Sequence, residues 1–233
     1  MAPDHIISVG SELVAYGLCI LYFYAGHRKY GFRVPLLFLV GSLYWNLILE
    51  NVAVILGFFT YTFPNPSTGP YYILWTGLTP LWISIGWFDI TFPAFMLLEN
   101  VLPKASIWIK AVAGGVLALS LDLAIDPAAT AAGLWKWTHP SLYFLGVPVT
   151  NYIGWFMLTT FYLAVYQSVH MKIKFSALVS TKPFSVTPKP SFDVPLKTVP
   201  TLIARLMIFQ LALLAIYIPV LYTIASIGTL PGG

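Results

Sequence analysis

Charged side chains are scarce in this 233-residue sequence: they make up 9% of it, and only eight residues are Asp or Glu. A soluble domain carries about a quarter of its residues as charged side chains. Hydrophobic residues make up 58% of this chain, so it lacks the polar residues needed to cover a soluble surface. The sequence therefore predicts an integral membrane protein.

Several kinds of site are excluded by what is missing. A single cysteine, Cys19, excludes a disulfide framework and a thiolate metal site. No second histidine lies at metal-ligand spacing from His139, so we expect no metal site. No Walker A, Rossmann, zincin or nucleophile-elbow pattern occurs, which argues against nucleotide-driven chemistry. We expect no cofactor and no nucleic-acid partner.

Six apolar runs are long enough to cross a bilayer, whose core of roughly 30 Å takes about 20 residues of helix. They are residues 6–26, 35–58, 72–98, 107–125, 149–171 and 201–228. The segment 127–147 leaves room for a seventh, short helix. The sequence thus predicts an all-α, multi-pass bundle of six transmembrane helices that forms one integral membrane domain over residues 1–233, in the cell membrane if the source is prokaryotic.

The basic residues favour one orientation of this bundle. All but Lys136 fall in or beside the loops around 27–34, 99–106 and 172–200. Cytoplasmic loops carry an excess of Lys and Arg, so we expect these loops in the cytoplasm and both termini outside. Within the last loop, the Pro- and Lys-rich segment 175–200 is expected to be extended and to rest near lipid headgroups.

Three acids, Glu50, Asp89 and Asp122, stand inside apolar runs. An ionisable group within a membrane segment is costly unless it faces a partner or a wet cavity, which makes each a functional candidate. In the expected orientation Glu50, Asp122, Asp126 and Glu12 lie in the outer half of the membrane. Asp89 lies toward the cytoplasmic half.

Glu50 has Asn46 one turn before it and Asn51 beside it. Residues four apart share a helix face, so Asn46 and Glu50 predict a polar seam in the bundle interior. Glu50 is then either a general acid or base, or a protonated side chain that hydrogen-bonds a neighbouring helix.

Asp122 and Asp126 are also four residues apart, and two close carboxyl groups tend to share a proton. Asp126-Pro127, followed by small residues and Gly133, also fits the N-cap, first position and stop of a short helix. For Asp126 capping and catalysis both stay open, whereas Asp122 has no such local alternative and is expected to be functional.

The remaining ionisable residues are expected to be structural. For Asp89, which follows Trp87 and Phe88, we expect a pair with a neighbouring helix. Glu12 and Glu99 lie near span ends and are expected to be solvated or interfacial, and His139 is expected on the surface.

The segment 122–155 is the densest in polar and aromatic residues. Its Trp135 and Trp137 form either an interfacial belt or the wall of a pocket. The segment resembles the integral membrane carotenoid biosynthesis family, which includes carotenoid 1,2-hydratases. The resemblance rests on Asp122, Asp126-Pro127, Gly133-Leu134-Trp135-Lys136-Trp137 and the run from Gly146 to Trp155, together with Glu50, Gly57 and Tyr61.

The resemblance implies a cofactor-independent hydro-lyase that adds water across a terminal C=C of an acyclic polyene, with the polyene, water and the lipid bilayer as its partners. It implies catalytic roles for Glu50, Asp122 and Asp126. It also implies substrate contacts from Asn46, Asn51, Tyr61, Trp135, Trp137, Tyr143, Asn151 and Trp155.

Two other functions stay open at this point. A membrane carotenoid or terpenoid cyclase would use the same protonation but capture the cation with an internal alkene. A small proton-coupled transporter or lipid-binding membrane protein would use the acids to carry protons, and would be expected to show broken helices in paired halves.

Overall fold

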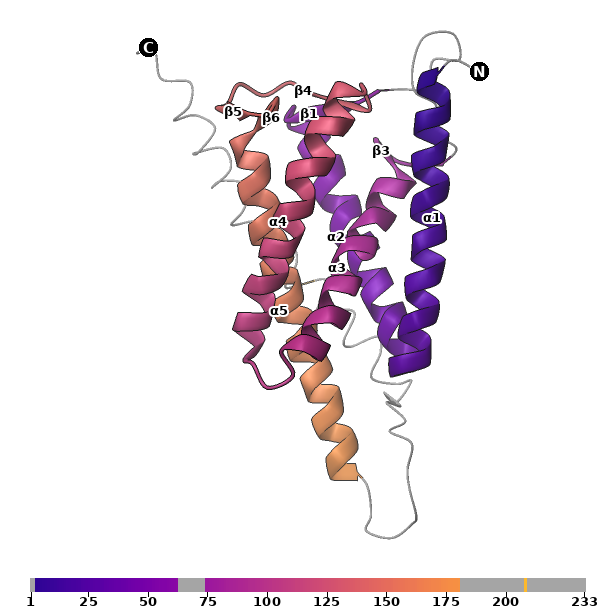
Figure 1. Ribbon diagram of the computed structural model, residues 1–233, viewed down its shortest axis with the longest axis vertical. Coiled ribbons are helices and arrows are strands. Elements are labelled where there is room, and N and C mark those ends of the chain that lie inside the picture. Colours follow the sequence, from indigo (N-terminus) through magenta and orange to yellow (C-terminus); the bar gives the residue numbers. More distant parts are fainter. Residues whose placement is uncertain (1–2, 63–73, 181–207, 209–233) are drawn as a thin grey trace.

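Five long helices make up most of the part of the molecule that the structure describes (Figure 1). The computed structural model describes residues 3–62, 74–180 and 208. The helices are α1 (Pro3–Tyr30), α2 (Arg33–Ile55), α3 (Leu81–Val101), α4 (Ile107–Ala131) and α5 (Val149–Ser180). They run up and down side by side, so the turn from α1 to α2 and the turn from α3 to α4 lie at the same end of the bundle (Figure 1).

Four of these helices, α1 to α4, are long and apolar enough to cross a membrane. The prediction of a mostly helical fold with several helices able to span a membrane is therefore confirmed. The sixth expected span, 201–228, lies outside the described residues apart from residue 208. Six spans and outer termini stay predictions. α5 continues to Ser180, into the segment expected to be a loop, and residues 181–200 lie outside the described residues.

Short strands join the helices at the other end of the bundle (Figure 1). β1 (Phe59–Tyr61) pairs antiparallel with β4 (Trp135–Trp137), so Tyr61 lies opposite Trp135 and Phe59 opposite Trp137. β2 (Trp75–Thr76) pairs with β3 (Thr79–Pro80), and β5 (Tyr143–Phe144) pairs with β6 (Val147–Pro148). The β1–β4 pair ties the connection after α2 to the connection after α4.

The short helix expected after Asp126 does not form, and no seventh span lies in 127–147. α4 continues through Asp126 and Pro127 to Ala131, and Gly133, with a φ of +71°, turns the chain into β4. A proline inside a membrane helix is tolerated where neighbouring groups satisfy the freed backbone. Asp126 is therefore not an N-cap.

The third span begins later than expected. Residues 75–80 form the β2–β3 turn, where Gly77 has a φ of +69° that a helix does not contain. Pro80 is the residue just before the helix, and Pro93 lies inside α3. This shift places Asp89 in the half of α3 that is nearer the strands, so the prediction that it lies in the opposite half is wrong.

Basic residues gather at the end of the bundle away from the strands. Arg28 and Lys29 end α1, Arg33 begins α2, and Lys104 and Lys110 lie at the turn from α3 to α4. Lys110 forms a 2.7 Å ion pair with Glu99. Of the described basic residues only Lys136, on β4, lies at the strand end.

Aromatic packing holds the centre of the bundle, and small residues hold α4 against α5. Phe38, Phe88, Phe92 and Phe95 are fully buried in the main core cluster. Gly114 and Gly115 of α4 face α5, where a methyl group at Gly115 would lie 2.8 Å from the carbonyl oxygen of Phe156. Small residues of this kind let membrane helices approach closely.

Gly115→Ala is therefore expected to lower the stability of the purified protein by about 1–3 kcal/mol, because the added methyl group meets backbone that cannot move aside cheaply. Gly17→Ala is the matched control, because a methyl group there has no neighbour within 4 Å. Thermal unfolding in detergent checks both. Equal melting temperatures for Gly115→Ala and the unmodified protein would contradict the packing described.

Candidate active site

A cavity of about 330 Å³ lies inside the bundle near the strand end, and we call it the main cavity. Every described helix contributes to its wall, as do β1 and β4. Its lining includes Val14 and Leu18 of α1, Glu50 of α2, Trp87 and Asp89 of α3, Asp126 of α4, and Asn151 and Trp155 of α5. Three acidic residues on different helices, Glu50, Asp89 and Asp126, thus line one chamber.

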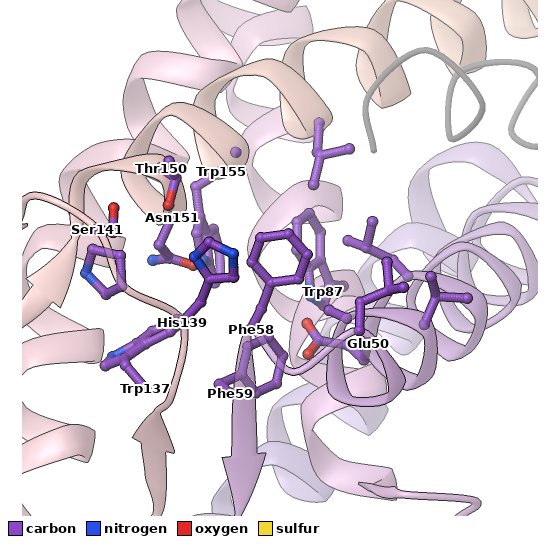
Figure 2. Close-up of a pocket in the computed structure, with 17 residues that line it drawn as sticks. Glu50, Phe58, Phe59, Trp87, Trp137, His139, Ser141, Thr150, Asn151 and Trp155 are labelled. Atoms are coloured by element: carbon purple, nitrogen blue, oxygen red, sulfur yellow. The ribbon is translucent and has the colours of Figure 1, made fainter. Parts of the chain in front are cut away.

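A smaller cavity of about 80 Å³, the side cavity, shares part of this wall. Figure 2 shows Glu50 and Asn151 on opposite sides of it, with the rings of Phe58 and His139 between them in this view. His139 is half-exposed, as expected for a surface histidine, and it also lines this cavity and stacks on Phe58 at a centroid distance of 4.9 Å. The two cavities meet along Glu50, Phe59, Trp87, Trp137, Asn151 and Trp155.

Glu50 is held by donors from its own helix and from β1. Asn46, one turn earlier on α2, donates to Oε1 at 3.1 Å, as the shared helix face predicts. The Tyr61 hydroxyl donates to Oε2 at 2.7 Å, and Trp87 also lies within hydrogen-bonding reach. Only 9% of Glu50 is exposed. The carboxyl group is therefore fixed in direction, and its satisfied oxygens explain how it can be buried.

Asp122 and Asp126 form a pair on one face of α4, joined by Asn151 of α5. The Asn151 amide donates to Asp122 Oδ2 at 3.1 Å and to Asp126 Oδ2 at 2.5 Å. The two carboxyl groups lie within hydrogen-bonding reach of each other, so they can share a proton. Asp126 lines the main cavity, whereas Asp122 is fully buried behind it and lines neither cavity.

Glu50 lies close enough to the aspartate pair to interact electrostatically with Asp126. The carboxyl groups predicted from separate helices are therefore brought together. Among the described residues, no group of three His, Cys, Asp or Glu side chains is close enough to hold a metal ion. The arrangement is suited to moving protons.

Aromatic rings contribute to the wall that the two cavities share. Trp87 of α3 stacks on Trp155 of α5 with centroids 4.8 Å apart and planes 14° apart. Phe59 and Trp137 meet edge to face at 5.2 Å across the β1–β4 pair. The chamber thus offers π faces to an apolar ligand, and such faces also attract a cation.

Most of the predicted substrate residues are brought to this region. Trp137, Asn151 and Trp155 line both cavities, and Tyr61 and Trp135 line the main cavity. Tyr61 and Trp135 also contact each other edge to face, with centroids 6.1 Å apart. Asn46 lies behind the cavities and acts on Glu50.

Two predicted substrate residues are not brought there. Asn51 holds the β2–β3 turn: its amide donates to the carbonyls of Leu47 and Thr76, and its Oδ1 accepts from the Leu78 N–H at 2.6 Å. Tyr143 is 44% exposed and donates to the carbonyl of His139. Neither lines either cavity.

Other residues were missed or misjudged. Trp87 and Phe59 line both cavities, and Asp89 lines the main cavity without the partner expected from a neighbouring helix among the described residues. For Asp89, the signals in the sequence were its position inside an apolar run and the aromatic pair before it. Glu12 is fully buried rather than solvated, and it accepts from the Tyr16 hydroxyl at 2.5 Å and the Leu74 N–H at 3.0 Å.

Comparison with known proteins agrees with the resemblance found in the sequence. A family model described as "Carotenoid biosynthesis protein" matches residues 9–230. Bisanhydrobacterioruberin hydratase of Haloarcula japonica is 30% identical over 103 residues. That alignment covers 43% of this chain and 32% of the hydratase, so the chain spans about a third of the length of that curated relative. No solved structure gives a significant match.

The role of Asn151 as the shared donor can be tested by stability. Asn151→Leu is expected to cost about 1–3 kcal/mol, because Asp122 and Asp126 lose their amide donor while buried. Adding Asp126→Asn should restore part of that loss, since the new amide can donate to Asp122 and one acidic group is removed. Thermal unfolding of both proteins checks this coupling. Equal stability of Asn151→Leu and the unmodified protein would rule out the bridge.

Proposed function

The chain belongs to the carotenoid biosynthesis protein family, and from that premise we propose that it is a membrane carotenoid hydratase. The proposed reaction adds water across a terminal C=C of an acyclic polyene end group by acid catalysis, without a cofactor. One observation carries the proposal: Glu50 and Asp126 face the same cavity, which is otherwise walled largely by apolar and aromatic side chains.

We assign the proton donor to the Asp122–Asp126 pair and the base to Glu50. Both Glu50 oxygens accept hydrogen bonds, from Asn46 and Tyr61, so Glu50 is arranged as an acceptor, the state that a base needs. Asp122 and Asp126 share a single amide donor, that of Asn151. A proton shared between the two carboxyl groups supplies a further hydrogen bond between them. Asp126 delivers that proton because it is the member that lines the cavity.

The reaction then proceeds in two steps that add one water in total. Asp126 gives its proton to the less substituted alkene carbon, whose π electrons form the new C–H bond and leave a tertiary cation. A water held by Glu50 attacks the cation through oxygen to form the C–O bond, and Glu50 takes the released proton. The proton returns from Glu50 to the aspartate pair before the next turnover.

The aromatic wall fits the cationic intermediate of this scheme. The stacked Trp87 and Trp155 and the edge-to-face Phe59 and Trp137 present π density to the chamber between the two acidic centres. A cation close to an aromatic face is stabilised by about 0.5–2 kcal/mol, more when water is excluded. The same rings provide an apolar surface for the polyene chain.

The distribution of basic residues supports one placement of the protein in the membrane. We place the strand end of the bundle on the outer side, because Arg28, Lys29, Lys104 and Lys110 lie at the opposite end. The cavity then lies in the outer half of the bilayer. A polyene that crosses the membrane would present one of its ends there.

A cyclase is the second candidate, favoured by the apolar lining of the main cavity, in which an internal alkene could reach the cation before water does. The two reactions share the protonation step. They differ in product mass, since hydration adds one water and cyclisation adds nothing.

Expression in a lycopene-accumulating host is expected to give pigments heavier by one water, detected by mass spectrometry of the extracts. Glu50→Gln and Asp126→Asn should each lower the rate by about 10²–10⁴-fold, the usual contribution of a general acid or base. Immunoblots of membranes show whether the variants accumulate normally. Isomers of unchanged mass would favour the cyclase, and full activity of either variant would remove that residue from the mechanism.

Two tyrosine variants give a matched test of the hydrogen bond to Glu50. Tyr61→Phe keeps the ring but removes the donor, and the rate should fall by about 10- to 100-fold, since hydrogen bonds to charged groups contribute about 1.5–3 kcal/mol. Tyr143→Phe removes an exposed hydroxyl that lines neither cavity, and it should leave the rate unchanged. Equal rates for the two variants would argue against a role for Tyr61.

A further inference from the structure

Asp89 is a buried carboxyl group that the proposed reaction does not use. It lies on α3, two residues after Trp87, and lines the main cavity with Glu50 and Asp126. Both of its oxygens are shielded from solvent, and neither has a hydrogen-bond partner in the part of the chain that the structure describes. A buried, unpaired polar group is costly, so a native structure that keeps one usually has a use for it.

The surroundings of Asp89 narrow the kind of partner it can take. The α1 residues that share the cavity with it are small or apolar apart from one hydroxyl: Ser11, Val14, Ala15 and Leu18. Cys19 lies close enough to interact with the charge of Asp89, but a thiol is a weak donor. None of the basic side chains that the structure describes lines the cavity. Asp89 therefore forms no ion pair with the basic residues that the structure describes.

Three features of the cavity point to an organic ligand with a hydroxyl group, or to water. The volume of about 330 Å³ is many times the ~30 Å³ share of one water, so an isoprenoid end group fits beside a water molecule. The rest of the lining is mostly apolar. A carboxylate accepts hydrogen bonds strongly, and an O–H group is a donor compatible with a membrane-soluble ligand.

We propose that Asp89 forms a subsite: its side chain turns from this shielded position into the main cavity and there accepts a hydrogen bond from an O–H group. The inference rests on the proposed hydration, in which two O–H sources occur: the water that enters and the tertiary alcohol that leaves. Asp89 thereby holds either the hydroxylated end group or the water reserve at the side of the cavity formed by α1 and α3.

The two sources are distinguished by two purified full-length variants, Asp89→Leu and Asp89→Asn. Binding of lycopene and of 1-hydroxylycopene in detergent micelles is measured by quenching of tryptophan emission, which needs no turnover. If Asp89 holds the alcohol, Asp89→Leu weakens binding of 1-hydroxylycopene by about 10- to 100-fold and leaves lycopene binding unchanged. If Asp89 holds water, both affinities stay the same and kcat for hydration falls. Asp89→Asn keeps an acceptor and should recover part of either loss.

Stability gives the control for a structural role. Removing an unpaired buried carboxyl group should leave the melting temperature of Asp89→Leu unchanged or raise it, because no partner is lost. A clear fall in melting temperature in both variants would reveal a structural partner and overturn the proposal. Unchanged binding of both polyenes together with unchanged kcat in Asp89→Leu would also overturn it.

The outcome for Asp89 is separable from that for the hydration. If the unmodified protein adds no water but distinguishes the two polyenes through Asp89, the subsite stands and the proposed reaction fails. If hydration occurs and Asp89→Leu affects neither binding nor kcat, the reaction stands and the subsite fails.

Discussion

A carboxyl group inside an apolar bundle has to find its hydrogen-bond donors within the protein. The arrangement of the rest of the site depends on which residues supply those donors. Glu50 obtains donors from α2 and β1, through Asn46 and Tyr61. Asp122 and Asp126 obtain one from α5, through Asn151. These bonds fix the rotation of α4 against α5 and the position of β1 over α2. The same bonds that make burial tolerable also hold Glu50 and Asp126 at the wall of one chamber.

The short β1–β4 pair links the element that holds Glu50 to the element that carries the aspartate pair. Three residue pairs join the connection after α2 to the connection after α4. One strand supplies Tyr61, the donor to Glu50, and the other supplies Trp135 and Trp137 to the cavity wall. α4, which carries the aspartate pair, leads directly into β4, with Gly133 making the turn. Glu50 and the aspartates are therefore positioned by a single unit of helix ends and strands.

The described helices and the burial of Glu50 and Asp122 within them could be predicted from the sequence, because apolar runs and the polar residues within them are local features. The predicted helix boundaries were wrong where turns and prolines set the backbone. The β2–β3 turn means that α3 begins only at Leu81, and α4 continues through Pro127 instead of ending before it. Contacts between separate elements were harder to predict. The sequence analysis missed Trp87, expected a helix partner that Asp89 lacks among the described residues, and assigned to the substrate Asn51, which holds the β2–β3 turn. A helix that is apolar on all sides does not reveal which face turns inward, so these contacts needed three-dimensional information.

The central claim is that Glu50 and Asp126 act from one cavity on the same polyene end group. An experimental structure of the protein with a bound acyclic polyene tests it most directly. The account predicts the terminal C=C in the main cavity, about 3–3.5 Å from the Asp126 carboxyl group, with Glu50 holding a water beside it. A polyene bound along the lipid-facing surface, with its end group remote from both carboxyl groups, would contradict the account.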